Sequence, residues 1–559
     1  MKKDSRQPPV QSRGTALAAG LAAALLGLSG SWSGAVAQSA SPDSETASLW
    51  PLAQRQAAIH RYSTLFTAQD VRDALSTDAG LERAIDWCRR TGVTKAYVEE
   101  FRDGYEAERA ALLKAKQRLQ QAGLQVSGCI TTTAVGKPST RSRNTIACYT
   151  DRPTQEHLQA IFEYAASLFD EIMIDDFWFT DCTCAACDAA RRARTVTIGA
   201  RTFPVAGDSW ADYRGELMTR LSQLRLLAAA KKINPQVRLI IKYPQWYDRF
   251  HERGYAVRRE TAAFDRIWVG TEVRDYQDRH WGGTVPYEGY FIMRWLGGIG
   301  DAKCGGGWYD WLGTTEATYL EQARQTILAG ARESMLFCYG GLQGGTGPKD
   351  VAALRANLPE LLAVADQVHR HRAVGLAAYK PADSPPEEEP YVFDFVGMLG
   401  LPLLPCHDFP ARAPAAFFSV HALKDARFEA ELRRFIGSGR PVLLTDGLVR
   451  RLGDRVNVGA ANVRVLRVNG HPKSLLDLPQ AELDNLRGPF LSVWKTQFRA
   501  PNKVGLYLFD DGSWVVENFN DQPVSVELNH RAMPVAGRGW TYAWHGTSDR
   551  GPATTAPSR

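Results

Sequence analysis

Residues 169–187 read Phe169-Asp-Glu-Ile-Met-Ile-Asp-Asp-Phe-Trp-Phe-Thr-Asp-Cys-Thr-Cys-Ala-Ala-Cys187, so a short apolar run ends in two carboxylates, an aromatic triplet and three cysteines. Aspartate is depleted in strands, and its charge is costly to bury without a partner. A lone Asp here would indicate a solvated turn, but Asp175 and Asp176 are adjacent and aromatic residues follow them. The segment therefore predicts a buried strand that ends at the mouth of an active site.

Strand-like apolar runs alternate with longer helix-like stretches between about residue 60 and 345, which is the pattern of βα units around a parallel sheet. Amphipathic stretches such as 156–168, 210–231 and 318–331 lie between the expected strands. These strands number eight: 62–66, 95–98, 125–130, 171–174, 237–242, 266–269, 289–293 and 335–339. Eight such units predict an α/β fold, a (β/α)₈ TIM barrel within residues 50–372.

Two further domains are expected after the barrel. Residues 373–455 contain a helical stretch, a Gly-rich turn and the buried strand 442–445, which is typical of a small open α/β (flavodoxin-like) domain. Residues 456–546 show β signals only, including a hairpin turn at Asp510-Asp-Gly512, and predict a β-sandwich. The tail 547–559 is rich in Thr, Ser, Pro and Gly, and we expect it to be disordered.

The N-terminus reads as a secretory signal peptide over residues 1–37. Basic residues precede an apolar run at 16–28, and Ala35-Val-Ala37 supplies a small-residue cleavage site. No later stretch reaches about 18 apolar residues, so we expect a periplasmic or secreted protein without membrane insertion after cleavage. Removing the charges of the leader leaves a formal charge of roughly +3, which is no signature of nucleic-acid binding.

The cysteines suggest a structural site. Nine cysteines are an odd number for an exported chain, and three of them, Cys182, Cys184 and Cys187, form a C-x-C-x-x-C cluster. This cluster could hold zinc with a fourth ligand from elsewhere, or its members could pair as disulfides. In either form we expect a structural role, with no cofactor needed for catalysis.

Catalytic groups of a TIM barrel lie at the C-terminal ends of the strands, where the βα loops converge. Carboxylates at several of these ends are the arrangement for a general acid paired with a nucleophile or base across a glycosidic bond. The expected catalytic residues are Asp175, Asp176 and Glu272. Because strand side chains alternate, only one of the two adjacent aspartates is expected to point into the pocket, and Asp176 is favoured.

The same rim offers candidate substrate contacts. Indole and phenol rings can stack on sugar C–H faces, although a single Trp is more often a core residue. Lys242 could donate to a sugar hydroxyl or keep a rim acid ionised, and Arg294 could clamp an anionic group or pair with a carboxylate. The candidate substrate-binding residues are Glu100, Trp178, Lys242, Tyr243, Trp246, Arg294 and Trp295. No P-loop, dinucleotide-binding or nucleophile-elbow motif is found.

The order of a barrel, an α/β domain containing Phe435-Ile-Gly-Ser-Gly-Arg-Pro-Val-Leu-Leu-Thr445 and a β-sandwich resembles glycoside hydrolases related to family 42 β-galactosidases. Those enzymes place Asn-Glu at strand four and Glu at strand seven, whereas this chain has Asp175-Asp176 and Arg294, so their catalytic residues do not carry over. Carboxylates at strands four and six are similar to the α-galactosidase clan. That likeness implies Asp175 or Asp176 as the nucleophile or base and Glu272 as the proton donor.

The sequence thus predicts an exported glycoside hydrolase whose partner is an oligo- or polysaccharide. The alternative is a non-catalytic glycan-binding protein on a degenerate barrel. The middle domain of the resembling family often mediates self-association, so the resemblance makes a homo-oligomer one of the possible states. The sugar, the linkage, the anomeric outcome and the oligomeric state stay open.

Overall fold

The computed structural model describes residues 42–143, 145–273 and 285–545. The expected signal peptide and the expected disordered tail therefore lie outside the described residues. Among the helices that are described, none has both the length and the apolar character that crossing a membrane requires.

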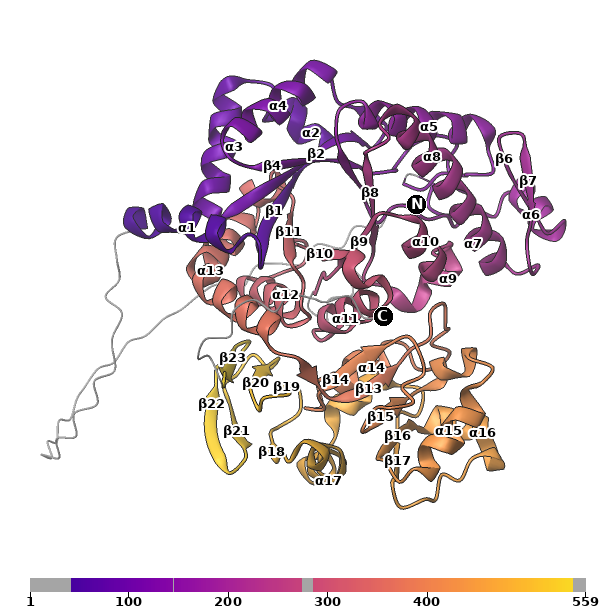
Figure 1. The fold of residues 1–559 in the computed structure, drawn as a ribbon, viewed down its shortest axis with the longest axis vertical. Helices are drawn as coiled ribbons and strands as arrows, with labels where there is room; N and C mark the ends of the chain where they lie inside the picture. The colour runs from indigo at the N-terminus through magenta and orange to yellow at the C-terminus, as the bar shows by residue number, and fades with distance from the viewer. Residues whose placement is uncertain (1–41, 144, 274–284, 546–559) are drawn as a thin grey trace, which may run out of the picture. The chain divides into compact units, whose positions relative to one another are not determined.

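Eight parallel strands close into a barrel, which Figure 1 shows as a ring of arrows. β1 pairs with both β2 and β11, and this double pairing completes the closure. The barrel strands are β1 (Arg61–Phe66), β2 (Val93–Arg102), β4 (Gln125–Ile130), β5 (Glu171–Ile174), β8 (Arg238–Tyr243), β9 (Arg266–Gly270), β10 (Cys304–Asp310) and β11 (Glu333–Phe337). A short strand, β3 (Tyr105–Glu106), extends β2 as an antiparallel hairpin. The predicted TIM barrel is confirmed.

Helices connect the barrel strands. Several begin at side-chain caps: Thr67 and Thr315 form capping boxes, and Asp151 and Ser209 accept from the first-turn backbone. The helices of this part are α1 (Pro42–Gln56), α2 (Ala68–Asp73), α3 (Asp78–Thr91), α4 (Arg109–Gln121), α5 (Arg152–Ala166), α6 (Ala185–Arg192), α7 (Trp210–Leu221), α8 (Ala228–Ile233), α9 (Phe250–Arg253), α10 (Val257–Ala263), α11 (Glu288–Gly300), α12 (Glu316–Leu328) and α13 (Gly347–Arg370). The hairpin β6 (Thr195–Ile198) and β7 (Arg201–Pro204) follows α6.

The seventh barrel strand is β10, so the strand predicted at 289–293 is wrong. Those residues belong to helix α11, which is buried along most of its length, and a short apolar run cannot be assigned by periodicity alone. The sequence pattern does not predict β10 because this strand contains three glycines, and glycine is depleted in strands. Two of these glycines are needed because neighbouring atoms leave no room for a side chain. A Cβ on Gly305 would lie 1.8 Å from the Trp268 ring, and one on Gly306 would lie 2.4 Å from Glu333 O.

Side-chain alternation along the strands positions the site. Tyr97, Met173 and Ile240 belong to the apolar cluster that fills the barrel interior. Because side chains alternate along a strand, the residues two positions later point to the same, inner face. These residues are Glu99, Asp175 and Lys242. The interior therefore changes from apolar to charged at the C-terminal end of the sheet.

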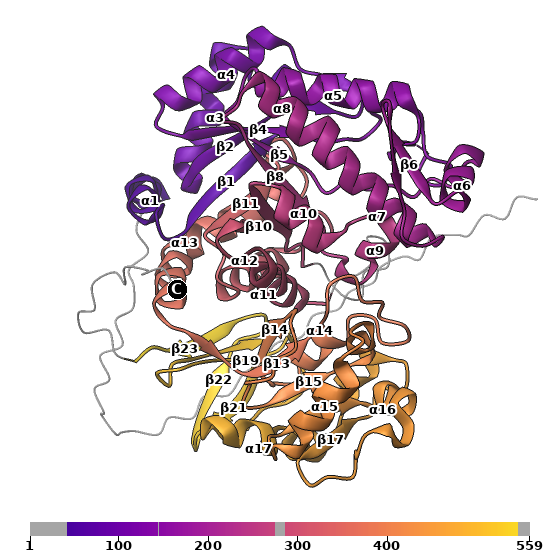
Figure 2. The ribbon, with the colours of Figure 1, turned by 45° about the vertical axis from the view of Figure 1, so that its right-hand side comes forward.

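The middle domain is a five-stranded parallel sheet, drawn in orange in Figure 2. Its order, β14-β13-β15-β16-β17, is the flavodoxin-like order 2-1-3-4-5. The strands are β13 (Leu376–Tyr379), β14 (Leu403–Cys406), β15 (Ala416–Phe418), β16 (Val442–Thr445) and β17 (Val463–Leu466), and the helices are α14 (Val392–Gly397), α15 (Phe428–Gly437) and α16 (Asp446–Leu452). β17 pairs with β16, so this sheet continues past the boundary expected at residue 455.

The C-terminal module packs two antiparallel sheets around a shared apolar cluster, and the predicted β-sandwich is confirmed. One sheet contains β12 (Ala373–Val374), β19 (Val504–Phe509), β20 (Trp514–Asn518) and β23 (Trp540–Ala543). The other contains β18 (Phe498–Arg499), β21 (Val524–Leu528) and β22 (Arg531–Val535). Helix α17 (Gln480–Leu491) precedes β18 and lies in a region, residues 456–546, for which the sequence predicts β-strands only.

Candidate active site

A single lysine gathers three carboxylates at the C-terminal rim of the barrel. Lys242 Nζ lies 2.6 Å from Asp176 Oδ2, 2.7 Å from Glu272 Oε1 and 3.8 Å from Asp175 Oδ1. The ammonium also lies 4.2 Å from the centre of the Trp308 ring, which belongs to the barrel interior. The side chain of Asp176 is 18% exposed, whereas that of Glu272 is 3% exposed. Asp176 is therefore the acid of this pair that solvent reaches more readily.

Both adjacent aspartates contribute to the site, so the expectation that only one points inward is wrong. Asp175 follows the alternation of β5 into the barrel. Strand β5 ends at Ile174, and the chain then turns, with Tyr255 Oη donating to Asp176 O at 2.8 Å. Because Asp176 is no longer held in the strand, its side chain also reaches Lys242.

Arg102 forms the second half of the charged rim, and the sequence reading missed it. Its guanidinium donates to Glu99 Oε2 at 2.7 Å and to Asp175 Oδ2 at 2.9 Å, and Thr131 Oγ1 lies 3.0 Å from the same Asp175 oxygen. The signal that could have found Arg102 is the length of β2, which continues to Arg102 rather than ending at residue 98. Asp175 is thus fixed between two cations and is poorly placed to react.

The charges around the aspartates separate their pKa values. Burial disfavours ionisation of Asp175, but Lys242 and Arg102 outweigh it and hold its pKa below the ordinary value. Burial raises the pKa of Asp176 to about 7; Lys242 opposes this rise, and Asp175 and Glu272 add to it. Neighbouring acids with separated pKa values are what distinct acid and base roles require.

The spacing of Asp176 and Glu272 follows from their shared partner. Their two oxygens lie 2.6 Å and 2.7 Å from one Nζ atom, so they are no farther apart than the sum of these distances. The two carboxylates are therefore close neighbours, and the bound on this pair of oxygens is nearer to the roughly 5–5.5 Å of a retaining pair than to the roughly 6.5–9.5 Å of an inverting pair.

Aromatic side chains border Asp176. Trp246 is half-buried, and its ring contacts those of Phe179 and Tyr255 at centroid distances of 5.4 and 5.6 Å. Arg253 lies over the rings of Trp246 and Phe179, 4.9 Å from each. Since Tyr255 bonds the backbone of Asp176, this aromatic group lies directly beside the acid.

Several predicted substrate contacts lie elsewhere. Trp178 is fully buried and donates to Ser222 Oγ at 2.9 Å, and Tyr243 Oη lies 3.0 Å from Thr261 Oγ1. Trp295 is buried on α11, where Nε1 donates to Lys380 O at 2.7 Å. All three are packing residues, as single aromatic residues more often are.

The two remaining predictions are also placed differently. Arg294 lies on helix α11 with its guanidinium 5.7 Å from the Tyr290 ring, so its assignment to a strand end is wrong. Glu100 is buried at the bulge of β2, where burial and the charges of Glu106 and Glu99 raise its pKa to about 9. The carboxylate at the true end of strand seven is Asp310, whose Oδ1 accepts from Leu312 N at 3.1 Å.

The cysteine cluster gains a fourth member. Cys148, in the loop before α5, joins Cys182, Cys184 and Cys187, and the four sulfurs all lie within 4.8 Å of one another. The Sγ–Sγ separations are 3.7 Å for Cys148–Cys184, 3.6 Å for Cys148–Cys187 and 3.6 Å for Cys184–Cys187. Cys148 could not be assigned by sequence because 33 residues separate it from Cys182.

Two segments of the chain match families of known proteins. Residues 48–352, more than half of the chain, match the family described as "Probable glycosyl hydrolase, catalytic domain", and residues 495–535 match "Probable glycosyl hydrolase, C-terminal domain". The chain belongs to this family of probable glycosyl hydrolases. The family's catalytic domain includes the whole charged rim described above.

The chain also resembles another protein and several solved structures. It is 24% identical over 341 residues to an uncharacterized protein of Saccharolobus solfataricus, a match that spans 58% of this chain and 56% of that relative. The chain therefore spans little more than half the length of this relative.

Solved glycosidases share the fold. The β-galactosidase of Bacillus circulans sp. alkalophilus has a TM-score of 0.55 at 11% identity, with 86% of this chain and 98% of that chain covered. Gan42B, a GH42 β-galactosidase of G. stearothermophilus, has a TM-score of 0.57 at 10% identity, with 87% and 98% covered. The α-L-fucosidase isoenzyme 2 of Paenibacillus thiaminolyticus has a TM-score of 0.58 at 10% identity, with 84% and 93% covered. The predicted resemblance to family 42 in domain order is confirmed.

Proposed function

We propose that the protein is an exported glycoside hydrolase that cleaves an oligo- or polysaccharide with retention of anomeric configuration. The observation that carries this proposal is the pair Asp176 and Glu272, joined through one Lys242 ammonium at the barrel rim. Membership of the glycosyl hydrolase family supports the class of reaction. The basic and apolar pattern of residues 1–37 supports export.

Within this proposal Asp176 is the acid/base and Glu272 the nucleophile, which reverses the roles implied by the α-galactosidase likeness. Four carboxylates, those of Glu99, Asp175, Asp176 and Glu272, lie close together around Lys242 and Arg102, so a proton held on one acid relieves their repulsion. Asp176 is the reactive acid whose pKa lies near neutrality, and it is the more exposed of the pair. A proton donor needs such a raised pKa.

The reaction then runs in two steps. Asp176 gives its proton to the glycosidic oxygen while a Glu272 oxygen attacks the anomeric carbon, so the C–O bond breaks and a glycosyl ester forms. Asp176, now ionised, takes a proton from water, whose oxygen attacks the same carbon and releases Glu272. Lys242 stabilises the carboxylate that is ionised at each stage, and Arg102 keeps Asp175 in place.

Incubation with glycans tests the function. The purified protein is expected to release sugars from at least one glycan of a broad bacterial and plant panel, followed by mass spectrometry. Early products are expected to retain the anomeric configuration by NMR, in keeping with the closeness of the two carboxylates. Inverted products would contradict the assigned pair. Glycan binding without any release would favour the non-catalytic binding protein instead.

We further propose that the four cysteines hold a structural zinc ion. Tetrahedral coordination at about 2.3 Å from each sulfur places the sulfurs about 3.8 Å apart, and a disulfide would place them about 2.05 Å apart. The observed 3.6 and 3.7 Å separations support the metal site. All four residues are cysteines, which is one of the ligand sets of closed structural zinc sites. The ion would join the loop before α5 to the start of α6, a few residues beyond Asp176.

Metal analysis tests the zinc site. We expect about one zinc per chain, and Cys148→Ser should lower both the zinc content and the melting temperature, the latter by roughly 5 °C or more. Cys88→Ser changes a buried cysteine outside the cluster and should retain the metal. A metal-free protein whose mass shows oxidised cysteine pairs would refute the site.

A further inference from the structure

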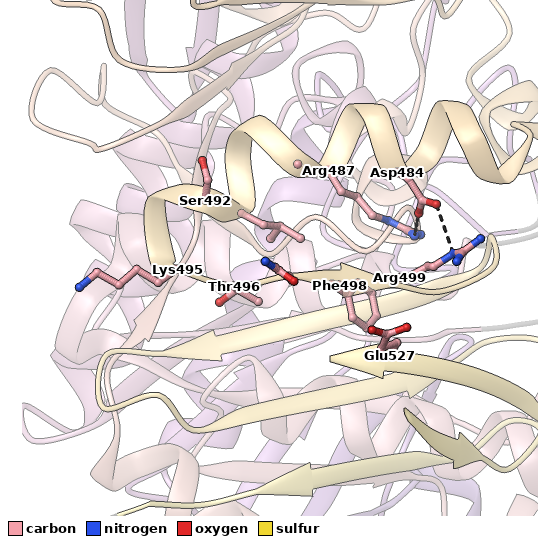
Figure 3. Close-up of a pocket in the computed structure, with 11 residues that line it drawn as sticks. Asp484, Arg487, Ser492, Lys495, Thr496, Phe498, Arg499 and Glu527 are labelled. Atoms are coloured by element: carbon pink, nitrogen blue, oxygen red, sulfur yellow. Dashed lines mark ion pairs between the residues drawn. The ribbon is translucent and has the colours of Figure 1, made fainter. Parts of the chain in front are cut away.

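The C-terminal module carries two adjoining surface hollows far from any residue of the charged rim in the sequence. One, of about 730 Å³, lies between α17, residues 492–497, β18 and Glu527 (Figure 3). The second, of about 420 Å³, lies between Trp494, the β19–β20 turn and Asn529. Lys495 and Thr496 line both hollows, so the two are adjacent, and we call the pair the C-terminal groove.

The groove is lined by equal numbers of positively and negatively charged side chains. The lining residues of the two hollows include three cations, Arg487, Lys495 and Arg499, and three carboxylates, Asp484, Glu527 and Asp510. Figure 3 shows Asp484 between two of the arginines, with separations of 3.8 Å to Arg487 and 3.4 Å to Arg499. A groove without excess charge gives no advantage to a phosphate, a nucleic acid or an acidic peptide.

Arg487 contributes to the wall rather than to binding. It is buried, and its guanidinium donates to Leu399 O at 2.6 Å and to Ala500 O at 2.6 Å. The side chains of Lys495, Gln497 and Arg499, by contrast, are exposed. Together with Asp484 and Glu527 they present both hydrogen-bond donors and acceptors, the mixed set that sugar hydroxyls require.

Two tryptophans supply stacking surfaces. Trp494 and Trp514 are half-buried, line the second hollow and pack against the apolar cluster of the sandwich. A half-buried indole keeps part of its ring available to an apolar sugar face while the rest is fixed by packing.

The groove is held in shape before any ligand arrives. Gln497 N donates to Asn529 Oδ1 at 2.8 Å, and Asn529 N donates to Gln497 O at 2.9 Å, which ties its two walls together. Asn529 and His530 have left-handed backbones with φ values of 49° and 64° and form the tight turn between β21 and β22, which fixes Asn529 at the edge of the groove.

We propose that the C-terminal groove binds a chain of uncharged sugars, as an accessory site that holds polysaccharide substrate apart from the catalytic rim. This assignment rests on the proposed function for the substrate class. It adds a second, non-catalytic contact, which raises the effective concentration of polymer at the enzyme and leaves the cleavage of small glycosides unaffected.

Affinity electrophoresis of the full chain tests the groove, with arabinogalactan, xyloglucan, arabinoxylan and glucomannan as neutral probes and polygalacturonate as the charged probe. The runs use the Glu272→Gln background, so that cleavage cannot alter the gel. We expect retardation by at least one neutral polysaccharide. Trp494→Ala and Trp514→Ala should each bind about tenfold more weakly, which is the size of one lost aromatic contact.

Controls separate folding, binding and catalysis. Gln497→Ala alters only an exposed side chain of the groove and should also weaken binding. Trp50→Ala removes a half-buried indole of α1, outside the groove, and should leave binding unchanged. Three outcomes would contradict the proposed binding site. They are equal retardation of the groove variants and the parent, retardation by polygalacturonate alone, and no retardation by any neutral probe. With the Glu272 carboxyl restored, Trp494→Ala should cleave a small aryl glycoside at the parental rate. If the groove variants lose binding but the parent cleaves no glycan, the hydrolase proposal is contradicted and the proposed binding role of the groove is supported.

Discussion

Glu272→Gln is expected to reduce glycoside turnover by on the order of 10⁴-fold or more, because the amide cannot form the glycosyl ester. Glu272 Oε1 lies 2.7 Å from Lys242 Nζ, and the neutral isostere keeps this contact while losing the nucleophile. Asp176→Asn removes the proton donor and should cost about 10²–10⁴-fold with a poor leaving group. With an activated aryl leaving group, which needs no proton, Asp176→Asn should recover most of the first step, whereas Glu272→Gln should not.

Added azide distinguishes the two roles chemically. In Asp176→Asn, azide should intercept the glycosyl ester and give a glycosyl azide of retained configuration. In a Glu272→Ala variant, azide should occupy the vacated space and give the inverted azide. The reverse assignment of products would show that the roles are exchanged.

A matched carboxylate controls for burial. Glu260 is also buried, and burial with the charge of Asp383 raises its pKa to about 8, so it is largely neutral at pH 7. Glu260→Gln should therefore preserve both turnover and folding. An activity loss there as large as in Glu272→Gln would mean that buried carboxyl substitution, rather than loss of a nucleophile, explains the result.

The sequence predicts the parts of the site that follow from strand alternation. A strand that ends in Asp175-Asp176 places these residues at the barrel rim, and Lys242 and Glu272 lie on the same rim because they end strands five and six. These positions depend only on where a strand ends and on the parallel direction of the sheet. The ion pairs among them depend on side-chain reach, which the strand pattern does not contain.

The location of strand seven is predicted wrongly because its sequence is determined by tertiary packing. Gly305 and Gly306 are required because neighbouring strands occupy the space of their side chains, and this need is visible only in three dimensions. The pattern of residues 289–293 predicts a strand because helix α11 is buried on most sides and lacks a clear polar face. The same error assigns Arg294 and Trp295 to the rim and misses Asp310, which lies at the real end of strand seven.

Contacts between segments that are far apart in the sequence also could not be predicted from it. Cys148 joins the C-x-C-x-x-C cluster through the fold, and nothing near it in the sequence marks it as a ligand. Arg102 lies three residues after Glu99, a spacing that in a regular strand would place the two side chains on opposite faces. The bulge between Glu99 and Phe101 changes this register and lets Arg102 return to Glu99 and Asp175.

Lys242→Met should have the second large effect, on both stability and the pH profile. Removing one partner of a buried ion pair costs about 3–5 kcal/mol, because the remaining charges stay buried without compensation. Lys242 is 1% exposed and contacts Asp176 and Glu272 directly, so its loss leaves the carboxylates facing one another. Denaturant unfolding would measure the cost, and Lys242→Met combined with Asp176→Asn should recover part of it, because one repelling charge is then gone.

The pH profile separates a site role from a purely structural one. Asp176 must be protonated to donate, so activity should fall as pH rises through about 7, the pKa of that carboxyl. Lys242 lowers this pKa, so its removal should raise the pKa and move the alkaline limb of kcat/KM to higher pH.

Lys95→Met provides the matched comparison. Lys95 is 5% exposed in the same barrel, lies 2.8 Å from Glu171 and 3.6 Å from Glu333, and sits 4.4 Å from the centre of the Tyr97 ring. It therefore repeats the burial, the paired carboxylates and the aromatic contact of Lys242 away from the rim. Both substitutions should lower stability, but only Lys242→Met should displace the alkaline limb. Equal profiles in the two variants would mean that Lys242 supports the barrel without tuning the acid.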